Sequence, residues 1–138
     1  MGIAQMVALR SNCMKRKVAA VIVKDRRIIS TGYNGTPRGV KNCNEGGCPR
    51  CNSLAPSGTT LEECLCSHAE ENAIVQAARH GIRIENSEIF VTASPCYDCF
   101  KMIANAGINK IYFGEFYRDE RIIALAEKLN IQLSDLSK

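Results

Sequence analysis

The chain has 138 residues, of which 46% are hydrophobic and 23% are charged, with a formal net charge of +4. This length and composition fit one globular domain that is large enough to bury a core. They exclude a membrane protein, because no apolar run is long enough to span a bilayer and the N-terminus lacks the pattern of a signal peptide. We therefore expect a single cytoplasmic domain over 1–138 that makes no membrane contact.

The first predicted elements are a short helix over 3–12 and a β-hairpin formed by the apolar runs 18–23 and 27–32. Between 33 and 67 the periodicity disappears, and glycine, proline, asparagine and cysteine dominate. A structureless stretch of this length is unusual inside a small domain. Something other than a hydrophobic core is therefore expected to hold it.

Regular periodicity returns at His68. The expected elements are a helix from His68 to Gly81, a strand over 88–93, a helix over 96–106, a strand over 110–114, a helix over 122–129 and a short edge strand over 131–133. Strands that alternate with helices are typical of parallel pairing in a layered sheet. Together with the hairpin, they predict a three-layer α/β/α fold with a mixed sheet of about five strands and helices on both faces.

Two short motifs stand at the starts of two of these helices. Residues 68–70 read His-Ala-Glu, and residues 95–99 read Pro-Cys-Tyr-Asp-Cys. His68, Cys96 and Cys99 offer three zinc ligands, and a zinc site with three protein ligands keeps a position open for water, as catalytic sites do. The combination of His-x-Glu with Pro-Cys-x-x-Cys is the signature of zinc-dependent nucleobase deaminases.

The chemistry of such a site follows from its charges. Two thiolates, a neutral imidazole and Zn²⁺ sum to zero, so a bound water ionises near neutral pH, and the positive ends of both helices favour the thiolates. Glu70 is then the expected general acid and base: it takes the proton of that water, delivers it to N3 of a cytosine ring, and protonates the amine that leaves as ammonia. The alternative is a zinc ribbon or knuckle in which Glu70 only complements the helix dipole.

Six further cysteines need a separate explanation: Cys13, Cys43, Cys48, Cys51, Cys64 and Cys66. All but the first lie in a cysteine-rich insertion at about 41–66, where a Cys-x-x-Cys pair with further cysteines nearby has the spacing of a structural zinc site. A closed site would supply the order that the composition does not. Six candidates exceed four ligands, which leaves either two spare thiols or two zincs that share a bridging sulfur. The alternative is a set of buried free cysteines, which suits Cys13 best.

A small group of basic residues lies near the N-terminus, namely Arg10, Lys15, Arg16 and Lys17. Other lysines and arginines are scattered along the chain. A modest group of this kind is more typical of a solvated face than of a nucleic-acid footprint.

Several segments together resemble the deoxycytidylate (dCMP) deaminases of the cytidine deaminase-like superfamily. They are 28–37 (Ile-Ile-Ser-Thr-Gly-Tyr-Asn-Gly-Thr-Pro), 68–74, 94–99 and 106–108. The resemblance implies the cytidine deaminase-like fold and zinc-dependent hydrolysis of dCMP to dUMP and ammonia, which feeds thymidylate synthesis. Free-cytidine deaminases generally have cysteine in place of His68, and tRNA adenosine deaminases lack the Gly-Tyr-Asn-Gly-Thr-Pro segment.

The resemblance also implies roles for substrate-binding residues. Asn34 is expected to contact the sugar, the backbone at Ala69 to cradle the pyrimidine, and Arg79 to bind the 5′-phosphate. Asn72 and Tyr117 are expected to help with phosphate or sugar. Each side chain also has an ordinary interpretation: a solvated cation in the last turn of a helix for Arg79, a helix-face amide for Asn72, and a tyrosine at the core edge for Tyr117.

The same resemblance implies a second zinc, a homo-oligomer that is often a hexamer, and regulation by dCTP and dTTP near the Gly-Tyr-Asn-Gly loop. The ligands implied for the second zinc are Cys13, Cys43, Cys66 and one of Cys48, Cys51 or Cys64. Two other functions stay open at this point. One is deamination of another base or nucleotide, such as a tRNA adenosine or a free nucleoside, and the other is a non-catalytic, zinc-stabilised nucleic-acid-binding module.

Overall fold

The structure is a computed structural model that describes residues 1–54 and 64–137. Its elements are α1 (Gly2–Ala8), β1 (Ala19–Lys24), β2 (Arg27–Tyr33), the 3₁₀ helix η1 (Cys43–Glu45), α2 (Ala69–Arg79), β3 (Glu88–Ala93), α3 (Tyr97–Asn105), β4 (Lys110–Glu115), α4 (Glu120–Leu129) and β5 (Gln132–Asp135). All helices and strands expected from the sequence are present.

The first helix is shorter than predicted, because α1 ends at Ala8 and not at residue 12. The N–H groups of Leu9, Arg10 and Ser11 each bond to the carbonyl three residues earlier, so the chain tightens into a 3₁₀-type turn. The Ser11 hydroxyl then bonds the backbone and side chain of Asn34. This tertiary contact is what draws the chain away from the helix axis.

The sheet has five strands in the order β2-β1-β3-β4-β5. Strand β1 pairs antiparallel with both β2 and β3, whereas β3, β4 and β5 pair in parallel. The mixed sheet is thus confirmed, and so is the short edge strand at its C-terminal end. Helices α3 and α4 connect the parallel strands, as their sequence alternation predicts.

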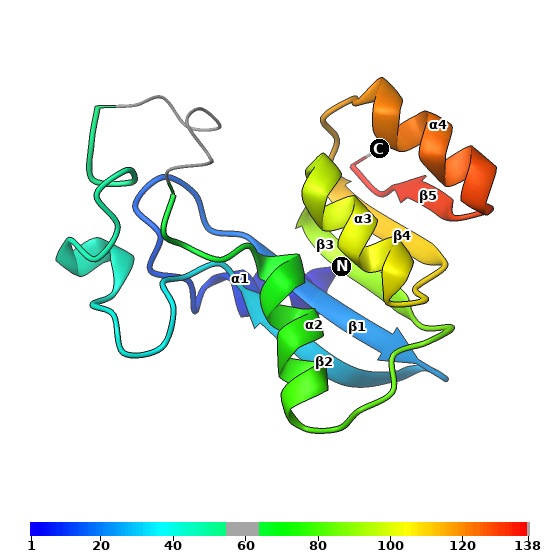
Figure 1. Cartoon of the computed structure of the whole chain (residues 1–138), viewed down its shortest axis with the longest axis horizontal. Coiled ribbons are helices and arrows are strands. Elements are labelled where there is room, and N and C mark those ends of the chain that lie inside the picture. Colours follow the sequence, from blue (N-terminus) through cyan, green and yellow to red (C-terminus); the bar gives the residue numbers. More distant parts are fainter. Residues whose placement is uncertain (55–63, 138) are drawn as a thin grey trace.

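Helices cover both faces of this sheet. Figure 1 shows α2 and α3 in front of the sheet and α1 behind it. Strand β1 is buried on both sides: Ala20 and Ile22 face the main core under α2, and the alternate residues Ala19 and Val21 are buried on the opposite face, where α1 packs. The side chains that complete the main core include Ile89, Val91, Phe100, Ile103, Ile111 and Phe113.

A close contact between backbones positions helix α2 on strand β2. A Cβ atom at Gly32 would lie 2.4 Å from both the carbonyl oxygen of Ala69 and the nitrogen of Ala73, so only glycine permits this approach. Two residues earlier, the buried Ser30 hydroxyl donates a hydrogen bond of 2.7 Å to the Ala73 carbonyl. The sheet therefore fixes the first turns of α2, which carry the His-x-Glu motif.

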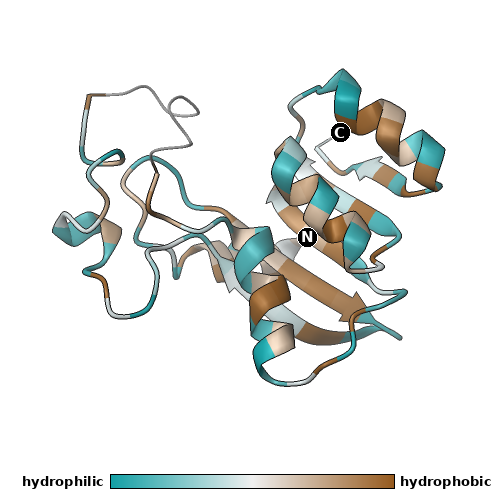
Figure 2. Cartoon of the chain, in the orientation of Figure 1, coloured by the Kyte–Doolittle hydropathy of each residue, from teal (hydrophilic) through white to brown (hydrophobic). Residues whose placement is uncertain are grey.

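The cysteine-rich insertion expected at 41–66 lies beside the sheet, at the left of Figure 1. Its residues 55–63 lie outside the described part of the chain. Figure 2 shows that the described part of this insertion is mainly hydrophilic, in contrast to β1. The buried apolar groups there are Cys43, Cys48, Cys51 and Cys66, with Cys13 and Cys64 packed against them. This segment has a cluster of thiols where a domain ordinarily has aliphatic side chains.

None of the helices in 1–54 and 64–137 combines the length and the apolar character that a membrane crossing requires.

Candidate active site

The two motifs meet at the N-termini of neighbouring helices. His68 is the N-cap residue of α2, and Cys96 is the N-cap residue of α3. The Cys96 sulfur accepts a hydrogen bond from the backbone N–H of Cys99 in the first turn of α3. Helix N-termini present a partial positive charge, which favours ionised thiols and a metal–thiolate centre at this junction.

The three proposed ligands of the catalytic zinc come together. The His68 Nδ1 atom lies 3.2 Å from the Cys99 sulfur and 3.6 Å from the Cys96 sulfur. All three donor atoms lie within 4.8 Å of one another. One imidazole nitrogen and two sulfurs at these separations fit a tetrahedral zinc with one position left for a non-protein ligand.

Electrostatic coupling distinguishes the two cysteines. Hydrogen bonding to Cys99, followed by the proximity of His68, lowers the pKa of the Cys96 thiol to about 4. Hydrogen bonding to Cys96 together with burial raises the pKa of the Cys99 thiol. The interaction with Cys96 also raises the pKa of His68 to about 9, despite the opposing effect of burial. Cys96 and His68 thus stabilise each other in their charged forms, a thiolate and an imidazolium.

Glu70 is buried at the same junction. It lies in the first turn of α2, is only 4% exposed, and lines the same cavity as His68 and Cys96. Burial raises the pKa of Glu70 to about 7, so this carboxyl group exchanges a proton near neutrality. Its neighbour Glu71 has a different task, because its carboxylate accepts the His68 backbone N–H at 2.9 Å and caps the helix.

The cavity at this junction has a volume of about 590 Å³, which is in the range of small-ligand sites. Three of the predicted substrate-binding residues line it, namely Asn34, Ala69 and Tyr117. The other two, Asn72 and Arg79, are not among its lining residues. The structure thus brings together the ligands, the acid and part of the predicted substrate site.

The Asn34 side chain is already engaged within the chain. Its amide oxygen accepts hydrogen bonds from the Ser11 hydroxyl at 2.7 Å and the Val18 N–H at 2.9 Å, and its amide nitrogen donates to the Arg16 carbonyl at 2.7 Å. These bonds join the loop after α1 to the end of β2. Sugar binding by Asn34 stays a prediction, and the observed bonds give it a structural task in shaping the cavity wall.

Two of the predicted substrate-binding residues, Arg79 and Asn72, lie outside the cavity lining. Arg79 is exposed in the last turn of α2, at the end of the helix opposite His68. Asn72 donates a hydrogen bond of 2.8 Å to the Tyr33 carbonyl and ties α2 to the end of β2. The length of this 11-residue helix separates Arg79 from the N-terminal end, where the cavity lies. Phosphate binding by Arg79 and substrate binding by Asn72 stay predictions.

Cations from elsewhere line the cavity instead. Lys15, Arg16 and Arg118 belong to the lining, so the first two are not simply part of a solvated face. The Arg16 guanidinium lies 4.9 Å from the ring centre of Tyr117 and pairs with Glu115, whose carboxylate also accepts the Tyr117 hydroxyl at 2.9 Å. The signal in the sequence is the position of Lys15 and Arg16 two and three residues after Cys13, which packs in the cysteine cluster.

Comparison with known proteins identifies the family. Residues 1–115 match the family described as "Cytidine and deoxycytidylate deaminase zinc-binding region". The chain belongs to this family. It is 46% identical over 134 residues to a deoxycytidylate deaminase of Schizosaccharomyces pombe, a match that covers 96% of this chain and 41% of that protein. It is also 40% identical over 118 residues to a deoxycytidylate deaminase of Mycobacterium phage D29, with 82% and 89% covered.

A solved structure extends this family relationship to the fold. The dCMP deaminase of cyanophage S-TIM5, in complex with dCMP and dUMP, superposes with a TM-score of 0.78 at 37% identity, covering 98% of this chain and 92% of that one. The cytidine deaminase-like fold expected from the sequence is confirmed. The chain spans only about two fifths of the length of the first curated family members that it matches, which are the yeast enzymes.

Proposed function

We propose that this protein catalyses the hydrolytic deamination of dCMP to dUMP and ammonia. The observation that carries the proposal is the convergence of His68, Cys96 and Cys99 beside the buried Glu70, in a cavity large enough for a nucleotide. The deoxycytidylate deaminases among its relatives support the same substrate. The product dUMP would supply thymidylate synthesis.

The proposed mechanism assigns the proton transfers to Glu70. His68, Cys96 and Cys99 would hold a zinc ion, which would supply the chemistry of lowering the pKa of water so that hydroxide is available near neutral pH. Glu70, with its pKa near 7, accepts a proton and delivers it to N3 of the pyrimidine. Once hydroxide has added to C4, Glu70 takes the proton of the new C4 hydroxyl and delivers it to the exocyclic amine; the C4–N bond then breaks, the C4 carbonyl forms and ammonia departs. Helix α2 holds this carboxyl group at a fixed position beside His68, so each transfer needs little rearrangement.

A panel of substrates tests the proposed function. We expect ammonia release from dCMP, and much slower release from cytidine, dCTP, guanine or a tRNA anticodon loop. The physical reason is a cavity with cations but a volume suited to one nucleotide. A preference for cytidine or for the tRNA loop would show that the protein is a deaminase with another substrate. Absence of ammonia with every substrate would favour the non-catalytic zinc module.

Three of the four lysine and arginine residues that line the cavity, Lys15, Arg16 and Arg118, are the proposed source of affinity for the 5′-phosphate. We expect Arg16→Gln to raise the KM for dCMP by about tenfold or more with a smaller change in kcat, because a hydrogen bond to a charged group contributes about 1.5–3 kcal/mol. Steady-state kinetics with dCMP and deoxycytidine measure this effect. The KM for deoxycytidine, which has no phosphate, should be the same as in the wild type.

Arg79→Gln is the matched control for this substitution. It removes the same charge from an exposed position outside the cavity lining, so we expect its KM for dCMP to stay near the wild-type value. If the KM rises in the Arg79 variant and not in the Arg16 variant, the phosphate lies where the sequence resemblance placed it.

Further features are part of the proposal. We propose that the cysteine cluster holds structural zinc, because the described part of the insertion, 41–54 and 64–66, has few buried apolar groups besides these sulfurs. The family resemblance implies a cytoplasmic homo-oligomer, often a hexamer, and regulation by dCTP and dTTP, and these stay predictions. The interpretation of the chain as one deaminase domain with a cysteine-rich insertion belongs to the same proposal.

A further inference from the structure

The cysteine cluster contains two overlapping groups of four sulfurs. One is formed by Cys13, Cys43, Cys51 and Cys66, and the other by Cys48, Cys51, Cys64 and Cys66; within each group all sulfurs lie within 4.8 Å of one another. Cys51 and Cys66 belong to both groups. The six sulfurs therefore form two tetrads with a common edge.

The separations between the sulfurs match the edges of metal-centred tetrahedra. Three of them are 3.8 Å for Cys13 and Cys51, 3.7 Å for Cys48 and Cys64, and 3.6 Å for Cys51 and Cys64. A tetrahedral zinc with Zn–S bonds of about 2.3 Å places its sulfurs about 3.8 Å apart. A disulfide would instead need a separation of about 2.05 Å.

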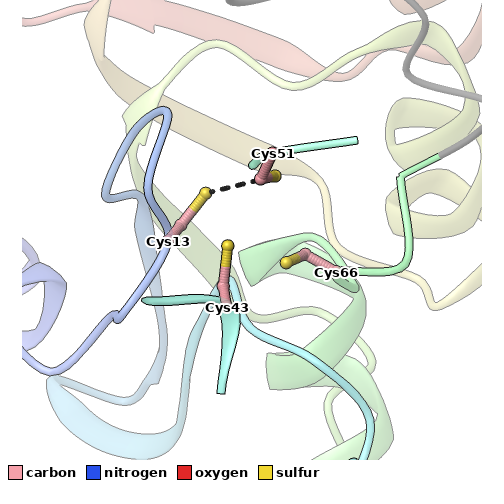
Figure 3. A group of neighbouring side chains, drawn as sticks. All are labelled: Cys13, Cys43, Cys51 and Cys66. Carbon is pink, nitrogen blue, oxygen red and sulfur yellow. Dashed lines mark hydrogen bonds between the residues drawn. The ribbon is translucent and has the colours of Figure 1, made fainter. Parts of the chain in front are cut away.

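Figure 3 shows how the first tetrad converges. The side chains of Cys13, Cys43, Cys51 and Cys66 come from different segments and direct their sulfurs toward a common space. A single tetrahedral zinc takes four thiolates, so it would use one tetrad and leave two cysteines of the other at ligand spacing. Occupying both tetrads leaves no sulfur of the cluster unused.

We propose that the six cysteines hold two zinc ions as one binuclear cluster, in which Cys51 and Cys66 each bridge both ions. Cys13 and Cys43 complete the coordination of one ion, and Cys48 and Cys64 complete the coordination of the other. This inference rests on the proposed zinc binding by the cluster and is independent of the proposed deaminase chemistry.

The surroundings suit the charge of such a cluster. Six thiolates and two Zn²⁺ ions sum to −2. The side chain of Arg50 is 6% exposed and its Nη1 atom lies 3.8 Å from the bridging Cys51 sulfur. Backbone N–H groups of Met14 and Leu65 donate to the terminal sulfurs of Cys43 and Cys48, each at 3.3 Å. A buried guanidinium and N–H···S bonds stabilise thiolates more than neutral thiols.

The bridged arrangement links the structural cluster to the candidate active site. Cys66 precedes His68 by two residues, and the backbone pairing of Gly35 with Ser67 lies between them. Cys13 precedes the cavity residues Lys15 and Arg16. One binuclear cluster would thereby fix both the chain that enters α2 and the loop that carries Lys15 and Arg16 of the cavity lining.

The number of zinc ions per chain tests the inference. The intact protein, saturated with zinc and analysed by native mass spectrometry and metal analysis, is expected to hold three: one at His68, Cys96 and Cys99 and two in the cluster. Two zinc ions would overturn the binuclear inference and retain a single structural zinc. A count of one zinc ion per chain would overturn both the binuclear inference and the proposed structural zinc. Iron together with acid-labile sulfide would show that the cluster binds iron and not zinc, which would also overturn the inference. None of these outcomes depends on deaminase activity.

Paired substitutions locate the ions. Cys13→Ser with Cys43→Ser, and separately Cys48→Ser with Cys64→Ser, should each reduce the count from three to two, because each leaves one complete tetrad. If either pair left the wild-type count unchanged, that pair would not be a ligand pair. Cadmium-113 NMR of the exchanged wild-type protein needs no variant: two cluster resonances coupled through shared sulfurs are expected, and one resonance would overturn the inference.

Discussion

Substituting Glu70 with glutamine is expected to reduce kcat for dCMP by at least about 100-fold, the lower range of contributions from general acid–base catalysis. Glutamine keeps nearly the same shape in this buried position, where Glu70 is 4% exposed, but it can neither accept nor release the proton. Because Glu70 is not one of the three proposed zinc ligands, zinc content should be unchanged. Ammonia release and zinc per chain are measured on the same sample.

Glu127→Gln is the control for this experiment. Glu127 is an exposed acid on helix α4, so the same chemical change there should leave kcat within about twofold, as surface substitutions have small effects. If Glu70→Gln retained wild-type activity with zinc bound, the proton-transfer role would be wrong. If it lost zinc together with activity, Glu70 would act through the metal site and not as the acid and base.

Replacing Cys51 with serine is expected to remove most of the zinc-dependent stability of the fold. Chelating zinc from the wild-type protein should lower the Tm by about 10 °C or more, since metal binding contributes directly to folding and about 1 kcal/mol corresponds to a few degrees in a domain of this size. Cys51→Ser should show the lowered Tm without chelator and little further decrease with it. Thermal unfolding with and without a strong chelator measures both effects.

Leu54→Ser provides the matched control, because Leu54 lies three residues along the same loop and is fully exposed. Its Tm and its response to the chelator should equal those of the wild type. The interpretation of Cys51 as a spare buried thiol predicts a different pattern: the substitution would lower the Tm slightly, and the chelator would then lower it by as much as in the wild type.

Local patterns were sufficient for the regular elements. The boundaries of β3 agree with the predicted 88–93, and the glycines at 81 and 107 adopt the left-handed conformation expected after helix ends. Where the prediction differed, a tertiary contact was responsible. The helix predicted to residue 12 ends at Ala8, because Ser11 bonds to Asn34, which is 23 residues away in the sequence.

The proposed metal ligands and the proposed substrate-binding residues differ in how much of their arrangement the sequence reveals. His68, Cys96 and Cys99 were predictable as a set, since their residue types and spacing have few other uses. Arg79 was inferred from resemblance, and the helix places it outside the cavity lining, where Lys15, Arg16 and Arg118 lie instead. Which cations line one cavity depends on how distant loops pack. The sequence around a single lysine or arginine contains no pattern that predicts this packing.

The sequence alone determined that this chain carries a His-x-Glu and Pro-Cys-x-x-Cys pair at two helix starts, with six further cysteines in and near an aperiodic segment. A motif that consists of particular residue types at short spacing can be recognised in the local sequence. Only the tertiary structure decided which sulfurs are neighbours and that Cys51 and Cys66 are common to two tetrads. Those separations are set by the packing of four chain segments, over sequence distances of up to about 50 residues that no local periodicity spans.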